Sequence, residues 1–398
     1  MLGTAEGART ALCEAARHEC WRQFDLLLDR GADVNIGGEG GYLLQQLIKS
    51  NYQCSPSDII LFASPSDALS RIKRLLSLGA DPNAQARSNH HTALHAAVAG
   101  WNIKDSPFYE QVAQLLIDNG ADVNTRACTD IAHGYMFATE HEKWEPQSLL
   151  YHCAYHGSTS MAKLLLQNGA AVDVNLKAGY FGNALQVASF YGHMEMMQLL
   201  LDHGAEVNAQ GGHYGTALNA ACARSLSPDA IPTVQLLLEH GADVNIGGGE
   251  FGSALQTVCA RSISEAGTLA LILLDHGADV NARGGKYGTA LQAACFRSDG
   301  LVQLLLDRGA DVNAEGGEYG TALQAACMCF RNSTIAQLLL DRGANVNVQG
   351  GQYGTALQVA LLYRNLDLAQ LLVDRGADVN ANGGLYGSCL QIAVVQIL

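Results

Sequence analysis

The chain has 398 residues, of which 48% are hydrophobic and 16% charged, and this composition excludes a disordered chain. Its formal net charge is −14, which argues against nucleic-acid binding, because that function requires a surplus of Lys and Arg. The N-terminal residues show no signal-peptide pattern, and no apolar run approaches the ~20 residues that a membrane span needs. We therefore expect an intracellular protein without membrane contact, with the cytoplasm as the favoured compartment and the nucleus as the alternative.

A phrase of the form LLLDRGADVN recurs along the whole chain. Its glycines are separated by 41 to 49 residues up to Gly169 and by 32 to 37 residues from there on. A period of this size is typical of a repeat architecture that grows in one dimension. The ten glycines are Gly31, Gly79, Gly120, Gly169, Gly204, Gly241, Gly277, Gly309, Gly343 and Gly376.

A second phrase, GGEYGTALQAAC at 316–327, could suggest a phosphate-binding loop, because it is a glycine-rich turn that leads into a helix. A catalytic loop is normally needed once, whereas this phrase is written six times. Its repetition therefore indicates architecture, and we call the segment that precedes T-A-L-Q in each unit its finger. The copies lie at 211–222, 248–259, 284–295, 316–327, 350–361 and 383–394.

Each unit is predicted to form two helices. In one unit, Thr289 can cap the first helix while Gln292, three residues later, reaches back to it, which is the capping-box pattern. The second helix carries the Leu triplet Leu304–Leu306 and ends in Asp-Arg-Gly, where the cation meets the negative helix end and the glycine permits a left-handed exit.

Four of the eleven cysteines lie six residues after the Thr or Ser that opens a unit. They would occupy one site in successive repeats, whose helices pack too far apart for a disulfide. We expect small core residues in a reducing compartment. These cysteines are Cys222, Cys259, Cys295 and Cys327.

These phrases resemble the ankyrin repeat, which is marked by T-P-L-H-x-A-A, a Leu pair and G-A-D-V-N. TALHAAVAG at 92–100 lacks only the proline, and later units carry Gln in place of the His. The GGxYGTALQ variant resembles the ankyrin arrays of fungal multidomain proteins. The resemblance implies an all-α solenoid of stacked helix pairs with β-turn fingers, a concave face that binds other proteins, and neither enzyme activity nor a cofactor. We expect one domain over 1–398, with about ten repeats and a partial C-terminal one.

The first half of the chain departs from this regularity. Insertions are expected near 51–67, near 100–111, where the connection between two helices would lengthen, and at 125–147, within the third finger. The last segment carries Tyr135, Phe137 and Trp144. Loops of this length are usually functional or disordered, and aromatic residues dominate interaction hot spots. The rings either contact a partner or fold back over the neighbouring irregular units.

Two columns of residues run through the regular fingers. The aromatic positions, Phe181, Tyr214, Phe251, Tyr287, Tyr319, Tyr353 and Tyr386, are nearly identical in every unit, which favours packing of each ring on the next finger over a specific epitope. The residue before each ring varies instead, as expected for exposed positions that read a partner. The candidate partner-binding residues of this variable column are His213, Glu250, Lys286, Glu318 and Gln352, followed by Leu385.

Sites of other kinds are weaker. GGGEFG at 247–252 matches G-x-G-x-x-G, but no βαβ unit surrounds it. His152 and His156 have a spacing that suits a metal, with Cys153 between them, yet no third ligand is fixed by the sequence, so ordinary packing is favoured. An enzyme would need a catalytic cluster at these histidines or in 125–147.

We therefore expect a non-enzymatic scaffold that binds a partner protein through its fingers and concave face. The alternative is the ligand-sensing arm of a larger defence or signalling protein. The chain stops within an eleventh unit, CLQIAVVQIL, whose apolar face is unlike a terminal repeat. This ending fits a piece of a longer design, a shortened product, or an end that docks on a partner or on itself.

Overall fold

The computed structural model describes residues 11–16, 18, 20–35, 37–38, 41–49, 65–85, 91–104, 107–127, 147–170, 174–224, 230–261, 265–328, 333–385, 387–389 and 391–392. The chain divides into two compact units. Unit 1 comprises Met1–Ala188 and His193–Ala205, and unit 2 comprises Ser189–Gly192 and Glu206–Leu398. The organisation as a single domain stays a prediction.

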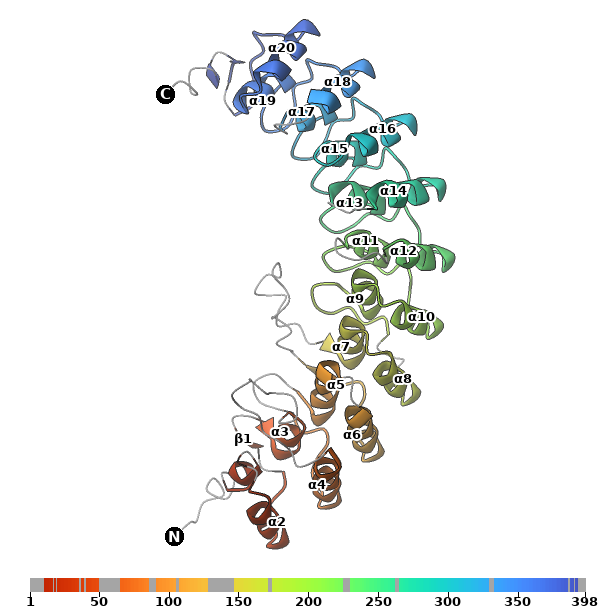
Figure 1. The fold of residues 1–398 in the computed structure, drawn as a ribbon, viewed down its shortest axis with the longest axis vertical. Coiled ribbons are helices and arrows are strands. Elements are labelled where there is room, and N and C mark those ends of the chain that lie inside the picture. The colour runs from red at the N-terminus through yellow and green to blue at the C-terminus, as the bar shows by residue number, and fades with distance from the viewer. Residues whose placement is uncertain are drawn as a thin grey trace. The chain divides into compact units, whose positions relative to one another are not determined.

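Unit 1 begins with a helical segment at 11–16 and contains two short antiparallel hairpins, which pair Gly37 with Tyr42 and Arg126 with Ser148. Its helices stack in two rows, α3–α5–α7 and α4–α6–α8–α10 (Figure 1). The elements are α2 (Trp21–Asp29), β1 (Gly37–Gly38), β2 (Gly41–Tyr42), α3 (Leu43–Lys49), α4 (Pro65–Ser77), α5 (Ala93–Lys104), α6 (Pro107–Asp118), β3 (Arg126–Ala127), β4 (Gln147–Ser148), α7 (Leu149–His156), α8 (Thr159–Gln167) and α10 (Met194–Asp202). Helix α9 (Ala184–Tyr191) is divided between the two units.

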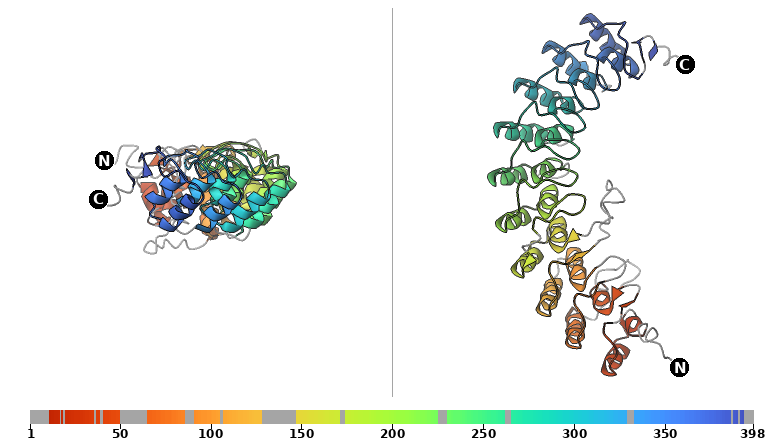
Figure 2. Two further views of the ribbon diagram at one scale, coloured as in Figure 1. Left: turned by 90° about the horizontal axis from the view of Figure 1, so that it is seen from above. Right: turned by 180° about the vertical axis from the view of Figure 1, so that it is seen from behind.

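The described part of unit 2 contains five copies of one helix pair. The first helices of the pairs form an inner row beside the fingers, and the second helices form an outer row (Figures 1 and 2). The inner helices are α11 (Ala217–Cys222), α13 (Ala254–Ala260), α15 (Ala290–Ala294), α17 (Ala322–Cys327) and α19 (Ala356–Leu362). The outer helices are α12 (Ala230–Glu239), α14 (Ala266–Asp275), α16 (Asp299–Asp307), α18 (Ser333–Asp341) and α20 (Leu366–Asp374).

The sequence explains where these helices begin and end. Thr289 and Gln292 form the predicted capping box at the start of α15, and equivalent boxes open α13, α17 and α19. After the outer helix α16, Gly309 adopts a left-handed conformation with φ of 85°, which glycine takes without the strain that a Cβ brings. The capping-box and glycine predictions are both confirmed.

The two rows bury different amounts of surface. All five residues of α15 are buried, and their Ala side chains allow close approach of neighbouring inner helices. The outer helix α16 buries only one face, formed by Leu301, Val302 and Leu305. A fully buried Leu of this kind contributes about 1.5–3 kcal/mol through the hydrophobic effect. The core therefore lies between the rows and continues from repeat to repeat.

The expected insertions have different outcomes. Residues 100–111 do not form a longer connection, because α5 runs to Lys104 and α6 begins at Pro107. The additional residues lengthen the helices, and each has 12 residues where α9 has 8. Of the insertion near 51–67, the structure describes only the last three residues, which open α4. Of the insertion at 125–147, it describes only the two ends. Within the described ranges, no helix is long and apolar enough to span a membrane.

Candidate functional site

The fingers of unit 2 are narrow hairpins. Within one finger, the Gly284 amide donates to the Gly288 carbonyl at 2.9 Å, and the equivalent bond joins Gly316 to Gly320 at 2.9 Å. Adjacent fingers are also joined through their backbones. The Lys286 amide donates to the Glu250 carbonyl at 2.9 Å. A partner would therefore meet a hydrogen-bonded ladder of fingers.

A buried glutamine fixes four of the described fingers of unit 2 to the preceding inner helix, whereas Asn219 donates to the Gly252 carbonyl at 2.8 Å in the finger before them. The Oε1 atom of Gln292 accepts the amide of Thr289 at 2.6 Å, which completes the cap of α15. Its Nε2 atom donates into the next finger, to the carbonyls of Ala314 at 3.4 Å, Gly316 at 3.0 Å and Gly320. We call this arrangement the glutamine bridge. It recurs at Gln256, Gln324 and Gln358.

The fingers approach one another closely because of their second glycine. Gly285 has φ of 61°, and a Cβ built on it would overlap the backbone of Phe251 in the preceding finger. A Cβ on Gly317 would likewise overlap the backbone of Tyr287. The second glycine of the pair is thus needed both for the turn and for contact between backbones.

Three of the aromatic positions, Phe251, Tyr287 and Tyr319, pack on one another as predicted. Phe251 stacks on Tyr287 with ring centroids 6.5 Å apart, and Tyr287 stacks on Tyr319 at 5.7 Å. Phe296, just after α15, lies 4.8 Å from the Tyr319 ring. Burial and the neighbouring Glu318 raise the pKa of Tyr319 to about 12. Tyr386 lies outside the described residues.

The variable column lies on the outside of the fingers. Glu250, Lys286, Glu318 and Gln352 are exposed and His213 is half-buried. Neighbouring side chains of the column interact: the Nε2 atom of His213 lies 3.0 Å from the Glu250 carboxylate, and the Lys286 ammonium lies 4.0 Å from Glu318. These pairs are half-exposed and hence weak, so a partner can replace them at little cost.

Tyr135, Phe137 and Trp144 lie outside the described residues, and their role stays a prediction.

The G-A-D-V-N turns form a second ladder. The Nδ2 atom of Asn281 donates to the Gly309 carbonyl of the next repeat at 3.1 Å, and its Oδ1 atom accepts the Asp311 amide at 2.7 Å. Asn83 makes the same two contacts in unit 1, with Gly120 and Asp122. The asparagines therefore join successive turns, and this accounts for their recurrence without a role in binding.

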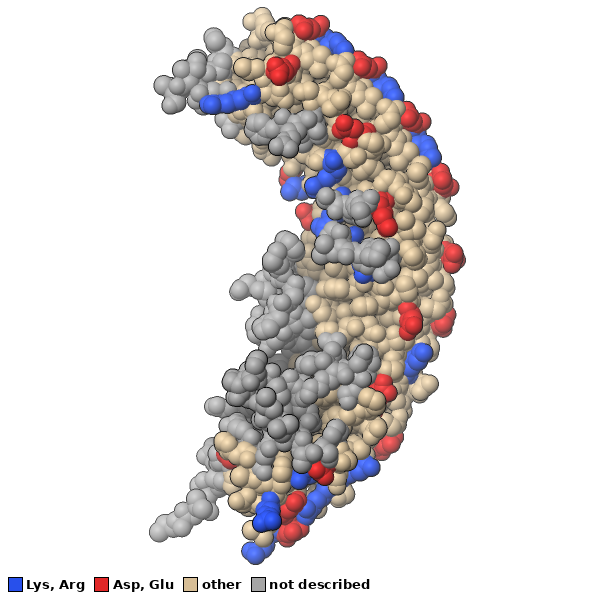
Figure 3. Space-filling model, viewed as in Figure 1, with Lys and Arg blue, Asp and Glu red and all other residues tan. Residues whose placement is uncertain are grey.

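The outer helices carry ion pairs between repeats. Arg308 contacts Asp275 at 3.0 Å, Arg342 contacts Asp307 at 3.1 Å and Arg375 contacts Asp341 at 3.0 Å. In unit 2, acidic and basic side chains consequently alternate along the edge of the outer row (Figure 3). The histidines at the same position behave differently. The Nδ1 atoms of His203, His240 and His276 lie within 2.9 Å of the carbonyl four residues earlier.

Unit 1 buries a group of histidines. His152 lies on α7 with 5% of its surface exposed, its ring 6.4 Å from that of His95, which stacks on His91 at 5.5 Å. Burial, with smaller contributions from His91 and His156, lowers the pKa of His152 to about 3. Burial together with His193 lowers the pKa of His156 to about 4. His152 and His156 are therefore neutral at physiological pH.

The described residues contain no group of three or more His, Cys, Asp or Glu side chains that could hold a metal ion. Cys153 is buried beside His152 and its thiol pKa is raised by burial, so it is not an activated nucleophile. The four repeat cysteines are buried and free, which confirms their prediction as core residues. Burial raises the pKa of Cys259 to about 12.

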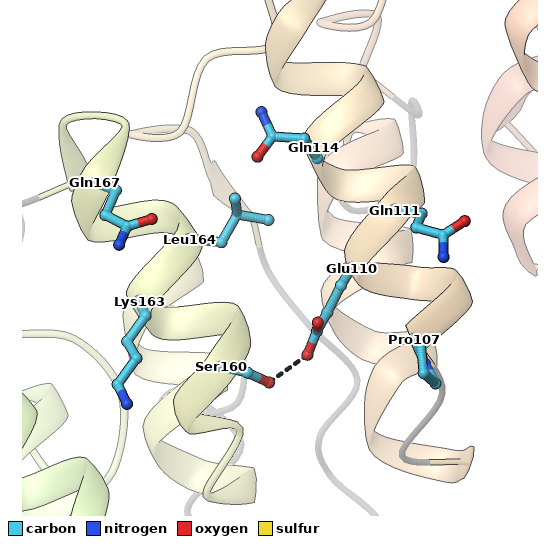
Figure 4. A pocket seen from close by; sticks show the side chains of 8 residues that line it. All are labelled: Pro107, Glu110, Gln111, Gln114, Ser160, Lys163, Leu164 and Gln167. Atoms are coloured by element: carbon cyan, nitrogen blue, oxygen red, sulfur yellow. Dashed lines mark hydrogen bonds between the residues drawn. The ribbon is translucent and has the colours of Figure 1, made fainter.

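An open groove of about 400 Å³ separates α6 from α8 in unit 1 (Figure 4). Its lining includes Glu110, Lys163 and Gln167, and the Ser160 hydroxyl donates to the Glu110 carboxylate. This hydrogen bond joins the neighbouring helices α6 and α8.

Sequence reasoning did not find the arginines that follow the inner helices. The Nε atom of Arg261 donates to the Ala223 carbonyl at 3.1 Å, and that of Arg297 donates to the Ala260 carbonyl at 2.9 Å. The recurring C-A-R-S and C-F-R-S phrases were the available signal, because they place an arginine at one position of successive units.

Comparison with known proteins agrees with this geometry. The family model of ankyrin repeats in sets of three copies matches residues 149–248, 231–316 and 291–383, and that of the single ankyrin repeat matches residues 89–128. Among solved structures, the ankyrin repeat domain of human ASB11 is 28% identical, with 58% of this chain and 99% of that chain covered and a TM-score of 0.46. No curated protein matches the chain. The triplet matches together span more than half of the sequence, and the chain therefore belongs to the ankyrin-repeat family.

Proposed function

We propose that the chain is a non-enzymatic scaffold that binds a partner protein through its fingers. Ankyrin repeats are generally protein-interaction modules. The observation that carries the proposal is the variable column: exposed side chains of differing charge project from fingers whose backbones are joined by hydrogen bonds. A rigid frame of this kind lowers the entropy lost on binding.

The binding residues of this proposal are His213, Glu250, Lys286, Glu318 and Gln352. Their charges change from finger to finger, whereas the buried framework beneath them repeats. This division of roles supports recognition by the column and support by the glutamine bridges. The aromatics of the third finger, Tyr135, Phe137 and Trp144, remain a second proposed contact.

The test is affinity capture from a native lysate. A variant with all five column residues replaced by Ser should lose a protein that the unchanged chain retains. The matched control replaces half-buried or exposed glutamines of the outer helices, Gln303, Gln337 and Gln370, by Ser. Retention of the same protein by the column variant would reject binding through the fingers. A further variant, in which 126–146 is replaced by a regular finger, tests the long loop separately.

A second candidate is the ligand-sensing arm of a larger defence or signalling protein. The GGxYGTALQ fingers, which resemble those of fungal multidomain proteins, favour it. An intracellular location, in the cytoplasm or nucleus, belongs to both proposals. Capture of an effector domain as part of the same polypeptide in source cells would favour the sensing arm.

A further inference from the structure

Unit 2 contains two sets of arginines in different electrostatic settings. Each member of the outer set, Arg308, Arg342 and Arg375, contacts an aspartate of the preceding repeat. The inner set consists of Arg261 and Arg297, after the inner helices, and Arg283, on a finger. Among the described residues, no carboxylate lies within ion-pair distance of the inner set. Aspartates thus neutralise the arginines of the outer set, whereas the arginines of the inner set keep their positive charge.

The backbone holds two of the inner guanidinium groups in place. Arg261 and Arg297 each use the Nε atom to donate to a carbonyl of the preceding repeat, at 3.1 Å and 2.9 Å. The two terminal amino groups of each side chain do not take part in that bond. A guanidinium held in this way loses little further freedom when a carboxylate binds to it.

The inner arginines adjoin the fingers. The Cζ atom of Arg261 lies 5.9 Å from the centroid of the Phe251 ring. Phe296, the residue before Arg297, contacts the rings of Tyr287 and Tyr319. The ends of the inner helices and the variable column therefore form one surface, and Lys and Arg side chains gather on this side of α11, α13 and α15 (Figure 3). We call it the inner basic surface.

The charge of this surface is opposite to that of the chain. In unit 2, the described fingers and the first three positions after each inner helix hold six cations and three carboxylates, although the chain carries −14. The cations are Arg224, Arg261, Arg283, Lys286, Arg297 and Arg364, and the carboxylates are Glu250, Glu315 and Glu318.

The order of these charges distinguishes the ligands that could bind. Arg283 and Lys286 share a finger, and the next finger presents Glu315 and Glu318. A nucleic acid carries phosphate throughout and would be repelled at the second finger. A polypeptide can place carboxylates against the first finger and a Lys or Arg against the second. Complementarity of this kind also suppresses binding of wrong partners.

We propose that the inner basic surface binds an acidic segment of the partner protein, with its Asp or Glu side chains on Arg261, Arg283 and Arg297 and a basic residue opposite Glu315 and Glu318. This inference rests on the proposed function, since it assigns a chemistry to the partner that the fingers bind.

The test uses a fluorescein-labelled twelve-residue peptide with eight Asp and Glu residues followed by four Lys residues. Fluorescence anisotropy compares the intact chain with an inner variant, Arg261→Gln, Arg283→Gln and Arg297→Gln, and with an outer variant, Arg308→Gln, Arg342→Gln and Arg375→Gln. Both variants lose three positive charges, so a general attraction changes equally in both. We expect the inner variant to bind at least tenfold more weakly and the outer variant less than twofold.

Equal losses in the two variants, or equal binding of a peptide with Gln and Asn in place of the acids, would overturn the proposal. So would preferred binding of a twelve-nucleotide oligothymidylate. If the inner variant does not fold, the single variant Arg283→Gln is measured in its place. Arg283 is exposed on its finger, so this change should leave the fold intact. We expect a threefold or greater loss from that single change, and no loss would contradict the proposal.

Lysate capture separates this inference from the proposed function. If the inner variant retains the same partner as the intact chain, the scaffold function stands and the acidic segment is rejected. If the intact chain retains no protein, the scaffold function itself fails, whatever the peptide result.

Discussion

One repeat of unit 1 differs from the bridged repeats of unit 2 in the polar group at the start of its first helix, although Gln45 elsewhere in unit 1 donates to the carbonyls of Ala84 and His91 as the unit 2 glutamines do. In unit 2, Gln292 caps its helix and donates into the next finger. At the corresponding position of unit 1, the Nδ1 atom of His95 lies 2.9 Å from the Thr92 hydroxyl, and its ring contacts His152 of the next repeat. An amide keeps its hydrogen-bonding pattern at every pH, whereas an imidazole does not. The two units therefore share a fold but differ in how acid affects their cores.

The largest expected effect is the acid sensitivity of unit 1. The pKa values of His152 and His156 are lowered to about 3 and about 4 in the folded chain. In the unfolded chain a histidine has a pKa of about 6.5, so between pH 6.5 and pH 4 both side chains take up protons only when the chain unfolds. Their stabilising contribution is complete above pH 6.5 and is lost as the pH falls toward 4. At pH 5 each histidine destabilises unit 1 by about 2 kcal/mol.

Hydrogen exchange resolved by peptide measures this difference. Between pH 7 and pH 5, amides of α5 and α7 should lose protection while those of α15 and α17 keep it. His152→Leu should remove about half of the loss, and His276→Gln, at an exposed helix end in unit 2, should have no effect. Parallel loss in both units would contradict the comparison.

The glutamine bridge offers the next largest effect. Gln292→Ala removes the cap and leaves buried carbonyls of the following finger without their donor, which we expect to destabilise α15 and α17 by about 3 kcal/mol. Native-state hydrogen exchange at pH 7 gives the change. The control is Gln303→Ala, which removes only an exposed contact with Asp307. Similar effects of the two changes would mean that the bridge contributes nothing beyond a surface hydrogen bond.

Removal of a finger ring should have a smaller effect. Tyr319→Ala deletes contacts with Tyr287 and Phe296 and should lower the free energy of local unfolding by about 2 kcal/mol. Tyr319→Phe keeps the ring and should stay within about 0.5 kcal/mol. Urea denaturation followed by tyrosine fluorescence and circular dichroism distinguishes them. If the Phe variant were as unstable as the Ala variant, the hydroxyl rather than the stack would be the important group.

The outer ion pairs should matter least. Arg342→Gln breaks an exposed contact with Asp307, and such pairs contribute less than about 1 kcal/mol. We expect a change in the thermal midpoint of less than about 1 °C in 0.5 M NaCl, where surface charges are screened. A larger shift at that salt concentration would show that the arginine acts through packing of its stem.

The sequence predicted features that depend on neighbouring residues. Thr289 and Gln292 predicted a helix cap because both partners lie within one turn of the same helix. The donation from Gln292 to Gly316, 24 residues away, could not be predicted, since it depends on how one repeat packs on the next. Residues 100–111 were expected to lengthen the connection between two helices because the repeat pattern is lost there. Most of them extend α5 and α6 instead, since packing between the helices, and not the repeat pattern, determines where these helices end.

The candidate site divides in the same way. The variation in residue type at one position of the repeat predicted that Glu250 and Lys286 are exposed. The contact between His213 and Glu250, and the arrangement of the inner arginines, depend on adjacent fingers and could be found only in three dimensions.

The glutamine bridge has a consequence for the history of such chains. Each of the four repeats that carry the bridge presents the same donor to three carbonyls at equivalent positions of the next finger, so the fit between neighbours does not depend on which of these repeats meet. A gene segment encoding one unit could be duplicated, deleted or exchanged without compensating substitutions at the junction. Each rearrangement would change the order of finger side chains in a single step. New combinations of surface charge could then arise by recombination, faster than by point substitution, while the framework stayed constant.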